Sequence, residues 1–221
     1  MATQKITAWS FSRYMDYLQC PLKAKFKFID RLKEPDNPAF EKGKRIHKLA
    51  EDFAKGAVKT LPAELKLLKA PFTALRKEKP HVELQWAFDT QWKAVEWFGP
   101  TAHFRLVLDA MSYIEKPSPV LRMIDHKTGK EYPYHNDQLS LYALGGFKRY
   151  PEVQTISSEL WYIDTGKVVE MQFRREEESA LEKDWKKRTA KMLKDTSFKP
   201  TPNDKCRWCH FRNSNGGPCK F

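Results

Sequence analysis

The sequence predicts an α/β fold, in which helices flank a central mixed β-sheet. Helical periodicity dominates residues 1–80, runs of branched and aromatic residues typical of strands fill 82–127 and 155–173, and a helical stretch separates the two groups of strands. The chain has 221 residues, 41% of them hydrophobic, which is enough for a sizeable core and argues against intrinsic disorder. We therefore expect one domain over residues 1–221, with a helical basic region at 1–80, a sheet core at 81–175 and a C-terminal helix and tail at 176–221.

The N-terminal third is expected to be helical and basic. Ser12 can cap a short helix that reaches Cys20, and Pro21 can start the next one. After a loop at 35–38, apolar residues recur every three or four positions from Phe40 to Ala54, which predicts a helix with one apolar stripe; a further helix is expected over 62–78. Residues 1–80 carry 18 basic and 9 acidic side chains of the 40 and 28 in the chain. This bias and the net charge of +12 favour an acidic partner such as nucleic acid.

The sheet is predicted from short segments bounded by turn residues. The expected strands are 82–88, 104–114, 120–127, 155–163 and 167–173, with helices at about 136–149 and at 176–194. The strands 104–114 and 120–127 are joined by a short connection at 117–119, and residues 164–166 are expected to form a hairpin turn.

Two of these strands carry acidic residues in apolar surroundings. Asp109 interrupts the run 106–111, where an unpaired carboxylate would cost several kcal/mol to bury. Asp125 repeats the anomaly on the next strand, and Lys127 projects from the same face because strand side chains alternate. If the strands pair, two carboxylates and one ammonium converge. The carboxylates can bind Mg²⁺ or Mn²⁺, which activates water against a phosphodiester, and Lys127 can orient that water or neutralise developing charge. The alternative is a buried Asp–Lys ion pair without chemistry.

The order of these residues resembles a known family. Asp109, the run Ile124-Asp125-His126-Lys127-Thr128-Gly129 and the helical pair Gln138 and Tyr142 are similar to the PD-(D/E)xK nuclease superfamily, specifically to its RecB-like branch. The resemblance implies a restriction-endonuclease-like core and a divalent-metal-dependent deoxyribonuclease. The residues that it makes catalytic are Asp109, Asp125 and Lys127.

The same resemblance implies metal-binding and nucleic-acid-binding roles. His47, in the run Gly43-Lys44-Arg45-Ile46-His47, matches the histidine of the branch and would join Asp109, Asp125 and the backbone carbonyl of His126 as metal ligands. A lone histidine on an apolar helical stripe is otherwise more often a core residue. The residues expected to contact DNA or support the site are Gln138, Tyr142, Lys44 and Arg45. Glu83 matches an acidic position of the family, either in support of the site or as a solvated residue of an edge strand.

Four cysteines remain to be explained. Cys206 and Cys209 form a C-x-x-C motif, Cys219 follows after nine residues, and Cys20 stands alone before Pro21. This split arrangement resembles the iron–sulfur nucleases of the branch, including CRISPR-associated RecB-like exonucleases and their phage-encoded relatives, and implies a [4Fe–4S] cluster that ties the two ends of the chain together. The gap before Cys219 is longer than is usual in the family, which leaves open a zinc site with His210 as a substitute ligand.

The expected substrate is DNA with single strands or free ends, bound through the basic region. Four N-terminal aromatic residues can either stack on bases or lie in the core: Trp9, Tyr14, Tyr17 and Phe26. No apolar run is long enough to span a membrane. We expect action in the cytoplasm, of the host cell if the protein is phage-encoded, with exonuclease and endonuclease action both open. The alternatives are a non-catalytic DNA-binding subunit with the same fold and a zinc-stabilised RNA-processing nuclease.

Overall fold

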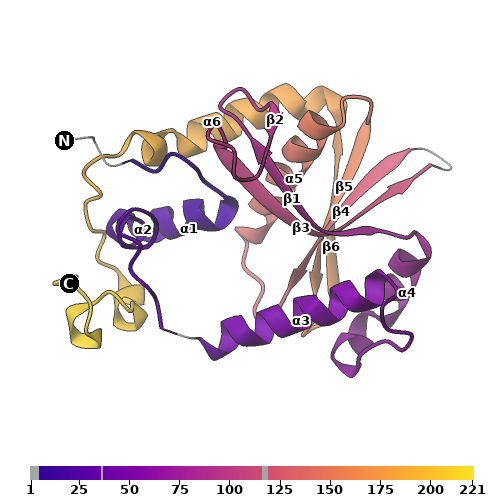
Figure 1. Cartoon of the computed structure of the whole chain (residues 1–221), viewed down its shortest axis with the longest axis horizontal. Helices are drawn as coiled ribbons and strands as arrows, with labels where there is room; N and C mark the ends of the chain where they lie inside the picture. The colour runs from indigo at the N-terminus through magenta and orange to yellow at the C-terminus, as the bar shows by residue number, and fades with distance from the viewer. Residues whose placement is uncertain (1–4, 36, 116–118) are drawn as a thin grey trace. The chain divides into compact units, whose positions relative to one another are not determined.

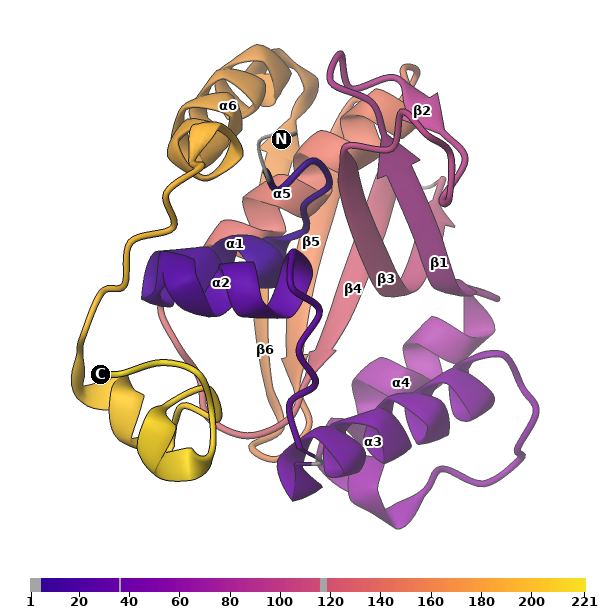
Figure 2. The ribbon, with the colours of Figure 1, turned by 60° about the vertical axis from the view of Figure 1, so that its left-hand side comes forward.

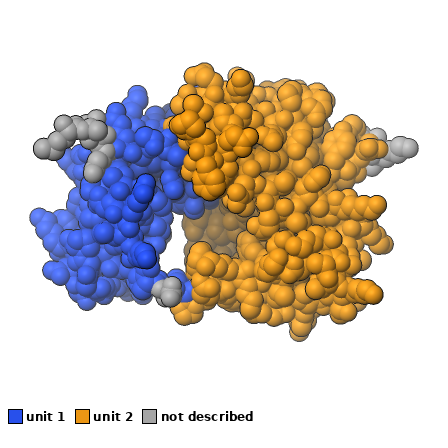
Figure 3. Space-filling model, in the orientation of Figure 1, with its two compact units in different colours: residues 1–37, 185–221 blue, residues 38–184 orange. Residues whose placement is uncertain are grey.

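The computed structural model describes residues 5–35, 37–115 and 119–221. The chain forms two compact units, coloured separately in Figure 3. One unit contains residues 38–184, and the other combines both ends of the chain, residues 1–37 and 185–221. The expected loop at 35–38 and connection at 117–119 include Asp36 and residues 117–118, which lie outside the described residues.

The unit of residues 38–184 is built on a mixed six-stranded sheet (Figure 1). Its strands are β1 (His81–Phe88), β2 (Ala94–Val95), β3 (Phe104–Ile114), β4 (Val120–Lys127), β5 (Thr155–Tyr162) and β6 (Lys167–Arg174). The strand order is β2-β1-β3-β4-β5-β6. Only β4 and β5 pair in parallel, because α5 (His135–Arg149) carries the chain between them; the other described pairs are antiparallel. The predicted mixed sheet is confirmed, and the sequence missed only the two-residue β2.

Three helices in the N-terminal part of this unit and the sheet share one apolar cluster. The helices are α3 (Pro38–Ala54), the 3₁₀ helix η1 (Ala63–Leu68) and α4 (Lys69–Lys77), and α3 lies beside α4 in Figure 2. Ile46 and Phe53 of α3 belong to one buried cluster with Phe72 of α4 and with Ile124 and Trp161 of the sheet. Burying such side chains stabilises the fold by about 1.5–3 kcal/mol each. The position of His47 is therefore fixed by a packed helix.

Helix α5 approaches the sheet closely because it carries adjacent glycines. A Cβ at Gly145 would lie 2.5 Å from Leu106 Cδ2, and a Cβ at Gly146 would lie 2.7 Å from Met123 Sδ. The helix contacts β4, β5 and β6. Gln138 and Tyr142, near its start, are thereby brought against the strands that carry the predicted catalytic residues.

The unit of the two chain ends packs around Trp185. It contains α1 (Phe11–Gln19), α2 (Pro21–Phe28), the last part of α6 (Glu178–Lys194) and the 3₁₀ helices η3 (Asp204–Trp208) and η4 (Asn213–Asn215). The Trp9 and Trp185 rings stack at 6.1 Å, and Phe11 and Tyr14 meet Trp185 edge-on. Trp9, Tyr14 and Tyr17 are buried, which supports the core alternative for these aromatic residues.

Most predicted helices are confirmed, with one correction at the first. The N-cap of α1 is Ser10, whose side chain accepts a hydrogen bond from the Arg13 backbone N–H; Ser12 lies inside the helix, so its predicted capping role is wrong. Pro21 starts α2 as expected, and residues 62–78 form η1 and α4 in succession. Within the described part of the chain, every helix is too short or too polar to cross a membrane.

Candidate active site

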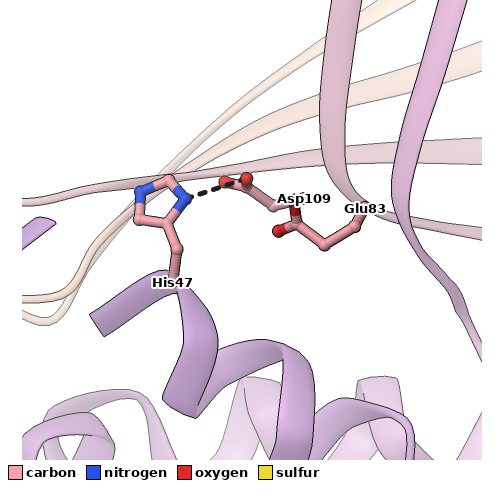
Figure 4. A group of neighbouring side chains, drawn as sticks. All are labelled: His47, Glu83 and Asp109. Carbon is pink, nitrogen blue, oxygen red and sulfur yellow. Dashed lines mark hydrogen bonds and ion pairs between the residues drawn. The ribbon is translucent and has the colours of Figure 1, made fainter. Parts of the chain in front are cut away.

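Three potential metal ligands meet where α3, β1 and β3 approach one another. His47, Glu83 and Asp109 each present one ligand atom, and these atoms lie within 4.8 Å of one another (Figure 4). His47 Nδ1 lies 3.0 Å from Asp109 Oδ1. Mg²⁺ and Mn²⁺ prefer oxygen ligands such as carboxylates to imidazole nitrogen. This group offers two carboxylates and one imidazole, so its ligand set suits either cation.

Local departures from regular strand geometry bring the two carboxylates into this group. Glu83 has a φ of +52°, although neighbouring Val82 and Leu84 pair regularly with β3. A positive φ costs a non-glycine residue of order 1–3 kcal/mol and is found mainly at functional sites. The regular pairing of β3 with β4 begins at Ala110, and Asp109 Oδ2 accepts a 2.5 Å hydrogen bond from the His126 backbone N–H. Asp109 is therefore fixed by β4, the strand that carries Asp125 and Lys127, the other residues predicted to be catalytic.

The electrostatics of the group favour a cation between the carboxylates. Burial lowers the pKa of His47, but the hydrogen bond to Asp109 and the charges of Asp109, Asp125 and Glu83 outweigh it and raise the pKa to about 9. Burial and the charge of Asp109 raise the pKa of Glu83. Burial opposes ionisation of Asp109, yet the His47 hydrogen bond and the His126 ring bring its pKa below the usual range. His47 thus carries a proton at neutral pH, and a divalent cation must displace this proton to use the imidazole.

Asp125 and Lys127 form the second part of the site. Lys127 Nζ lies 2.7 Å from Asp125 Oδ2 and donates a 2.7 Å hydrogen bond to Gln138 Oε1. Asp125 Oδ1 accepts hydrogen bonds from the Tyr142 hydroxyl at 2.5 Å and from Gln138 Nε2 at 3.2 Å. Asp125, Gln138 and Tyr142 are all buried. The helical pair therefore holds the acid and the lysine in fixed positions, which agrees with the supporting role considered for it.

A hollow of about 530 Å³ adjoins the metal-ligand group. Its lining includes His47 and Glu83, together with Lys44, Lys48 and Thr128. Lys44 is exposed and its Nζ lies 4.5 Å from the centre of the exposed Phe40 ring. Its neighbour Arg45 is absent from the lining of this hollow and forms an ion pair with Glu64. Of the two basic residues predicted to contact nucleic acid, Lys44 is thus the one beside the site.

The four cysteines gather in the other unit. Cys20, Cys206, Cys209 and Cys219 all line one small cavity of about 30 Å³, beside Phe26 and Phe211. The Thr201 backbone N–H donates to Cys20 Sγ at 3.4 Å, and Asn203 Nδ2 donates to the Gln19 carbonyl at 3.1 Å. The two chain ends therefore meet at the cysteines, as the sequence predicts.

The long gap before Cys219 is taken up by a tight turn. Gly216 has a φ of +82°, and a Cβ at Gly217 would lie 2.2 Å from the Phe211 backbone carbon. The Cys219 backbone N–H donates to the Phe211 carbonyl at 2.7 Å, which returns Cys219 to the cavity. His210 is exposed and is not among the residues that line it, so the structure gives no support to its alternative role.

The predicted site residues fall into three groups. His47 and Asp109 lie together with Glu83, which the sequence assigned only to support or solvation. Asp125 and Lys127 lie together with Gln138 and Tyr142. The four cysteines form the third group and lie apart from the other two in sequence. His126 joins the first two groups through its backbone N–H. Its ring is fully buried, and burial lowers its pKa.

Comparison with known proteins identifies the family of this fold. A solved structure of a candidate exonuclease from Eubacterium rectale is 15% identical, covers 93% of this chain and 88% of its own, and has a TM-score of 0.57. A second structure, of SSO0001, is 13% identical, covers 99% of this chain and 89% of its own, and has a TM-score of 0.41. No curated protein sequence matches the chain. The family model of the PD-(D/E)XK nuclease superfamily matches residues 8–110 and 107–214, and the chain belongs to this family.

Proposed function

We propose that the protein is a divalent-metal-dependent deoxyribonuclease that degrades single-stranded DNA or DNA ends as an exonuclease. The observation that carries the proposal is the meeting of His47, Glu83 and Asp109 beside the Asp125–Lys127 pair. Membership of a nuclease superfamily supports the reaction class. The similarity to the candidate exonuclease from Eubacterium rectale supports the exonuclease activity.

Each polar residue of the site has a role in this proposal. His47, Glu83, Asp109 and Asp125, with the His126 carbonyl, would hold Mg²⁺ or Mn²⁺. The bound cation would lower the pKa of a water molecule and stabilise negative charge on the scissile phosphate. Lys127 Nζ, held between Asp125 and Gln138, is fixed in position to orient the attacking water and to neutralise developing charge.

The supporting residues keep this arrangement rigid before substrate binds. Tyr142 donates to Asp125 Oδ1 and lies 3.2 Å from the Val107 carbonyl, so β3 and β4 both fix the position of its hydroxyl. Burial and the charge of Asp125 raise the pKa of Tyr142 well above its usual value, so its hydroxyl stays protonated and able to donate. Pre-arranged charges and hydrogen bonds of this kind need no reorganisation during reaction.

We propose that the cysteines hold a [4Fe–4S] cluster rather than a single zinc ion. Tetrahedral Zn²⁺ with bonds of about 2.3 Å would bring all sulfur atoms to about 3.8 Å of one another. Among the described residues, no three cysteine sulfurs lie within 4.8 Å of one another, although all four cysteines line one cavity. A cluster of four irons holds its thiolate ligands farther apart than one ion does. We therefore propose that the protein is related to the iron–sulfur nucleases of the RecB-like branch.

A digestion time course with end-labelled DNA tests the function. Anaerobically purified protein is incubated with Mn²⁺ and single-stranded DNA labelled at the 5′ or 3′ end, with a matched RNA in parallel. We expect Mn²⁺-dependent degradation of DNA by the wild type and none by Asp125→Asn. Absence of degradation by the wild type favours the non-catalytic DNA-binding subunit, and degradation of RNA alone favours the RNA-processing alternative.

A further inference from the structure

A group of aromatic side chains lies outside the site described above. The rings of Tyr132 and Tyr134 stack at 5.2 Å with 12° between their planes. His135 meets both rings edge-on, at 5.4 and 4.8 Å. The Tyr162 ring stacks on His135 at 5.9 Å, and its hydroxyl shares a 2.9 Å hydrogen bond with His135 Nδ1. We refer to Tyr132, Tyr134, His135 and Tyr162 as the aromatic platform.

The outer part of the platform is open to solvent. Tyr132 is 45% exposed and Tyr134 is half-buried, whereas Tyr162 at the inner end is buried. The two outer tyrosines belong to the segment that connects β4 with α5. Aromatic side chains stabilise a core or an interface through the large area that they bury. A stacked pair that is still open to solvent therefore offers area that a bound ligand can cover.

The inner end of the platform adjoins the catalytic lysine. Tyr162 is the partner of Lys127 in the parallel pairing of β5 with β4, where neighbouring backbones lie about 4.8 Å apart. Lys127 is also close enough to His135 for its charge to act: burial and then Lys127 lower the pKa of His135 to about 4. The platform therefore extends from the position expected for the scissile phosphate towards solvent.

We propose that the aromatic platform stacks unpaired nucleobases of the nucleotides next to the scissile phosphate, and so selects single-stranded DNA. The inference rests on the proposed nuclease function and names the substrate class for the same site. Unpaired bases expose their faces to aromatic rings, while bases inside a duplex are covered by their neighbours. Basic Lys44 and Lys48, beside the metal-ligand group, can contact the strand's phosphates without reading its sequence.

Equilibrium binding tests this inference without requiring cleavage. The probe is labelled oligodeoxythymidylate, measured by fluorescence anisotropy in EDTA, against wild type, Tyr132→Ala, Tyr132→Phe and Tyr113→Ala. Tyr113 is the matched control because it is 50% exposed and lies four residues beyond Asp109 on β3. Loss of one stacking contact is expected to weaken binding by Tyr132→Ala about 5- to 100-fold. Tyr132→Phe and Tyr113→Ala should bind as the wild type does, and Tyr132→Ala should bind blunt duplex as the wild type does.

A single abasic nucleotide, moved along the probe, locates the stacked base. At one or two positions it should weaken binding to the wild type and leave binding to Tyr132→Ala unchanged. Equal single-strand binding by wild type and Tyr132→Ala overturns the inference, as does an equal loss of duplex binding. Tyrosine-dependent binding by a protein that never degrades DNA would instead support the platform and refute the nuclease function.

Discussion

The candidate active site, here called the acidic site, contains His47, Glu83, Asp109, Asp125 and Lys127. This site and the cavity lined by the four cysteines hold their side chains in different ways. In the acidic site, Asp109 is bonded to His47 and to the His126 backbone, and Asp125 is bonded to three side chains. At the cysteine cavity, the hydrogen bonds to the cysteine sulfur atoms within the described part of the chain are two long backbone N–H contacts, from Thr201 to Cys20 at 3.4 Å and from Asn203 to Cys206 at 3.3 Å. Hydrogen bonds and ion pairs within the protein therefore fix the side chains of the acidic site more firmly than those of the cysteines.

This difference leads us to expect that the acidic site serves catalysis and that the cysteine cavity serves stability. The segment 195–221, which carries three of the four cysteines, contains short 3₁₀ helices, and its buried side chains are Phe198 and Phe211; we therefore expect its order to depend on what the thiolates bind. The acidic site rests on a packed helix and a six-stranded sheet. Changes at the acids and the lysine should abolish activity and spare the fold, whereas changes at the cysteines should weaken the fold.

The largest expected effect is on the rate of cleavage by Lys127→Ala. If Lys127 orients water and neutralises charge as proposed, its loss should lower kcat by about 10²- to 10⁴-fold. Mn²⁺ affinity and thermal stability should change little, because Tyr142 and Gln138 still hold Asp125. Lys130→Ala, an exposed lysine in the following segment, is the control. Unfolding of the Lys127 variant would identify a structural ion pair instead.

Cys206→Ser tests whether the cysteine cavity serves stability. Loss of a ligand of the proposed cluster should remove the brown colour that such a cluster gives and should cost about 4 kcal/mol, which lowers the unfolding temperature by roughly 8–16 °C for a chain of this size. His210→Ala, outside the cavity, should change neither. A colourless wild type with stoichiometric zinc, or an unchanged unfolding temperature for Cys206→Ser, would contradict the proposed cluster and its role.

Glu83→Gln tests whether the residue with the positive φ binds the cation. Removing one carboxylate ligand should weaken Mn²⁺ binding about 10- to 100-fold, measured by calorimetry. Glu51→Gln is a matched control, because Glu51 lines the same hollow but pairs with Lys48 and Lys55. Equal Mn²⁺ affinity in wild type and Glu83→Gln would restrict Glu83 to solvation of its strand.

The smallest effect should be the change in Mn²⁺ affinity that is caused by a shift of one pH unit. The pKa of His47 is about 9, so the imidazole is protonated below this pH and the cation must displace the proton. Affinity should rise about tenfold for each pH unit between 6.5 and 8.5, and this dependence should disappear in His47→Gln. A pH-independent affinity in the wild type would exclude His47 as a ligand.

The strands that carry the site could be predicted because their apolar runs are long and the acids interrupt them. Both 104–114 and 120–127 coincide with β3 and β4. The ligand position of Glu83 could not be predicted, since it depends on a positive φ that no residue type signals here. Lys44 and Arg45 are adjacent in sequence, but successive helical residues point about 100° apart, and Arg45 turns to Glu64.

Two other features also depend on three-dimensional contacts. The boundary between the compact units at residues 184 and 185 falls inside α6, where the sequence has no change of composition or punctuation. The aromatic platform joins residues 132–135 to Tyr162, which are distant in sequence and meet only because β4 and β5 pair in parallel. Pairing of strands across a helix cannot be read from local pattern alone.

The most direct test of the nuclease site measures Mn²⁺ binding and DNA degradation on the same anaerobic preparations. Wild type should bind Mn²⁺, detected by the change in its electron paramagnetic resonance signal, and should degrade end-labelled single-stranded DNA. Asp109→Asn should keep its iron–sulfur colour and unfolding temperature but lose both Mn²⁺ binding and degradation. An Asp109→Asn protein that binds Mn²⁺ and digests DNA as the wild type does would contradict the site.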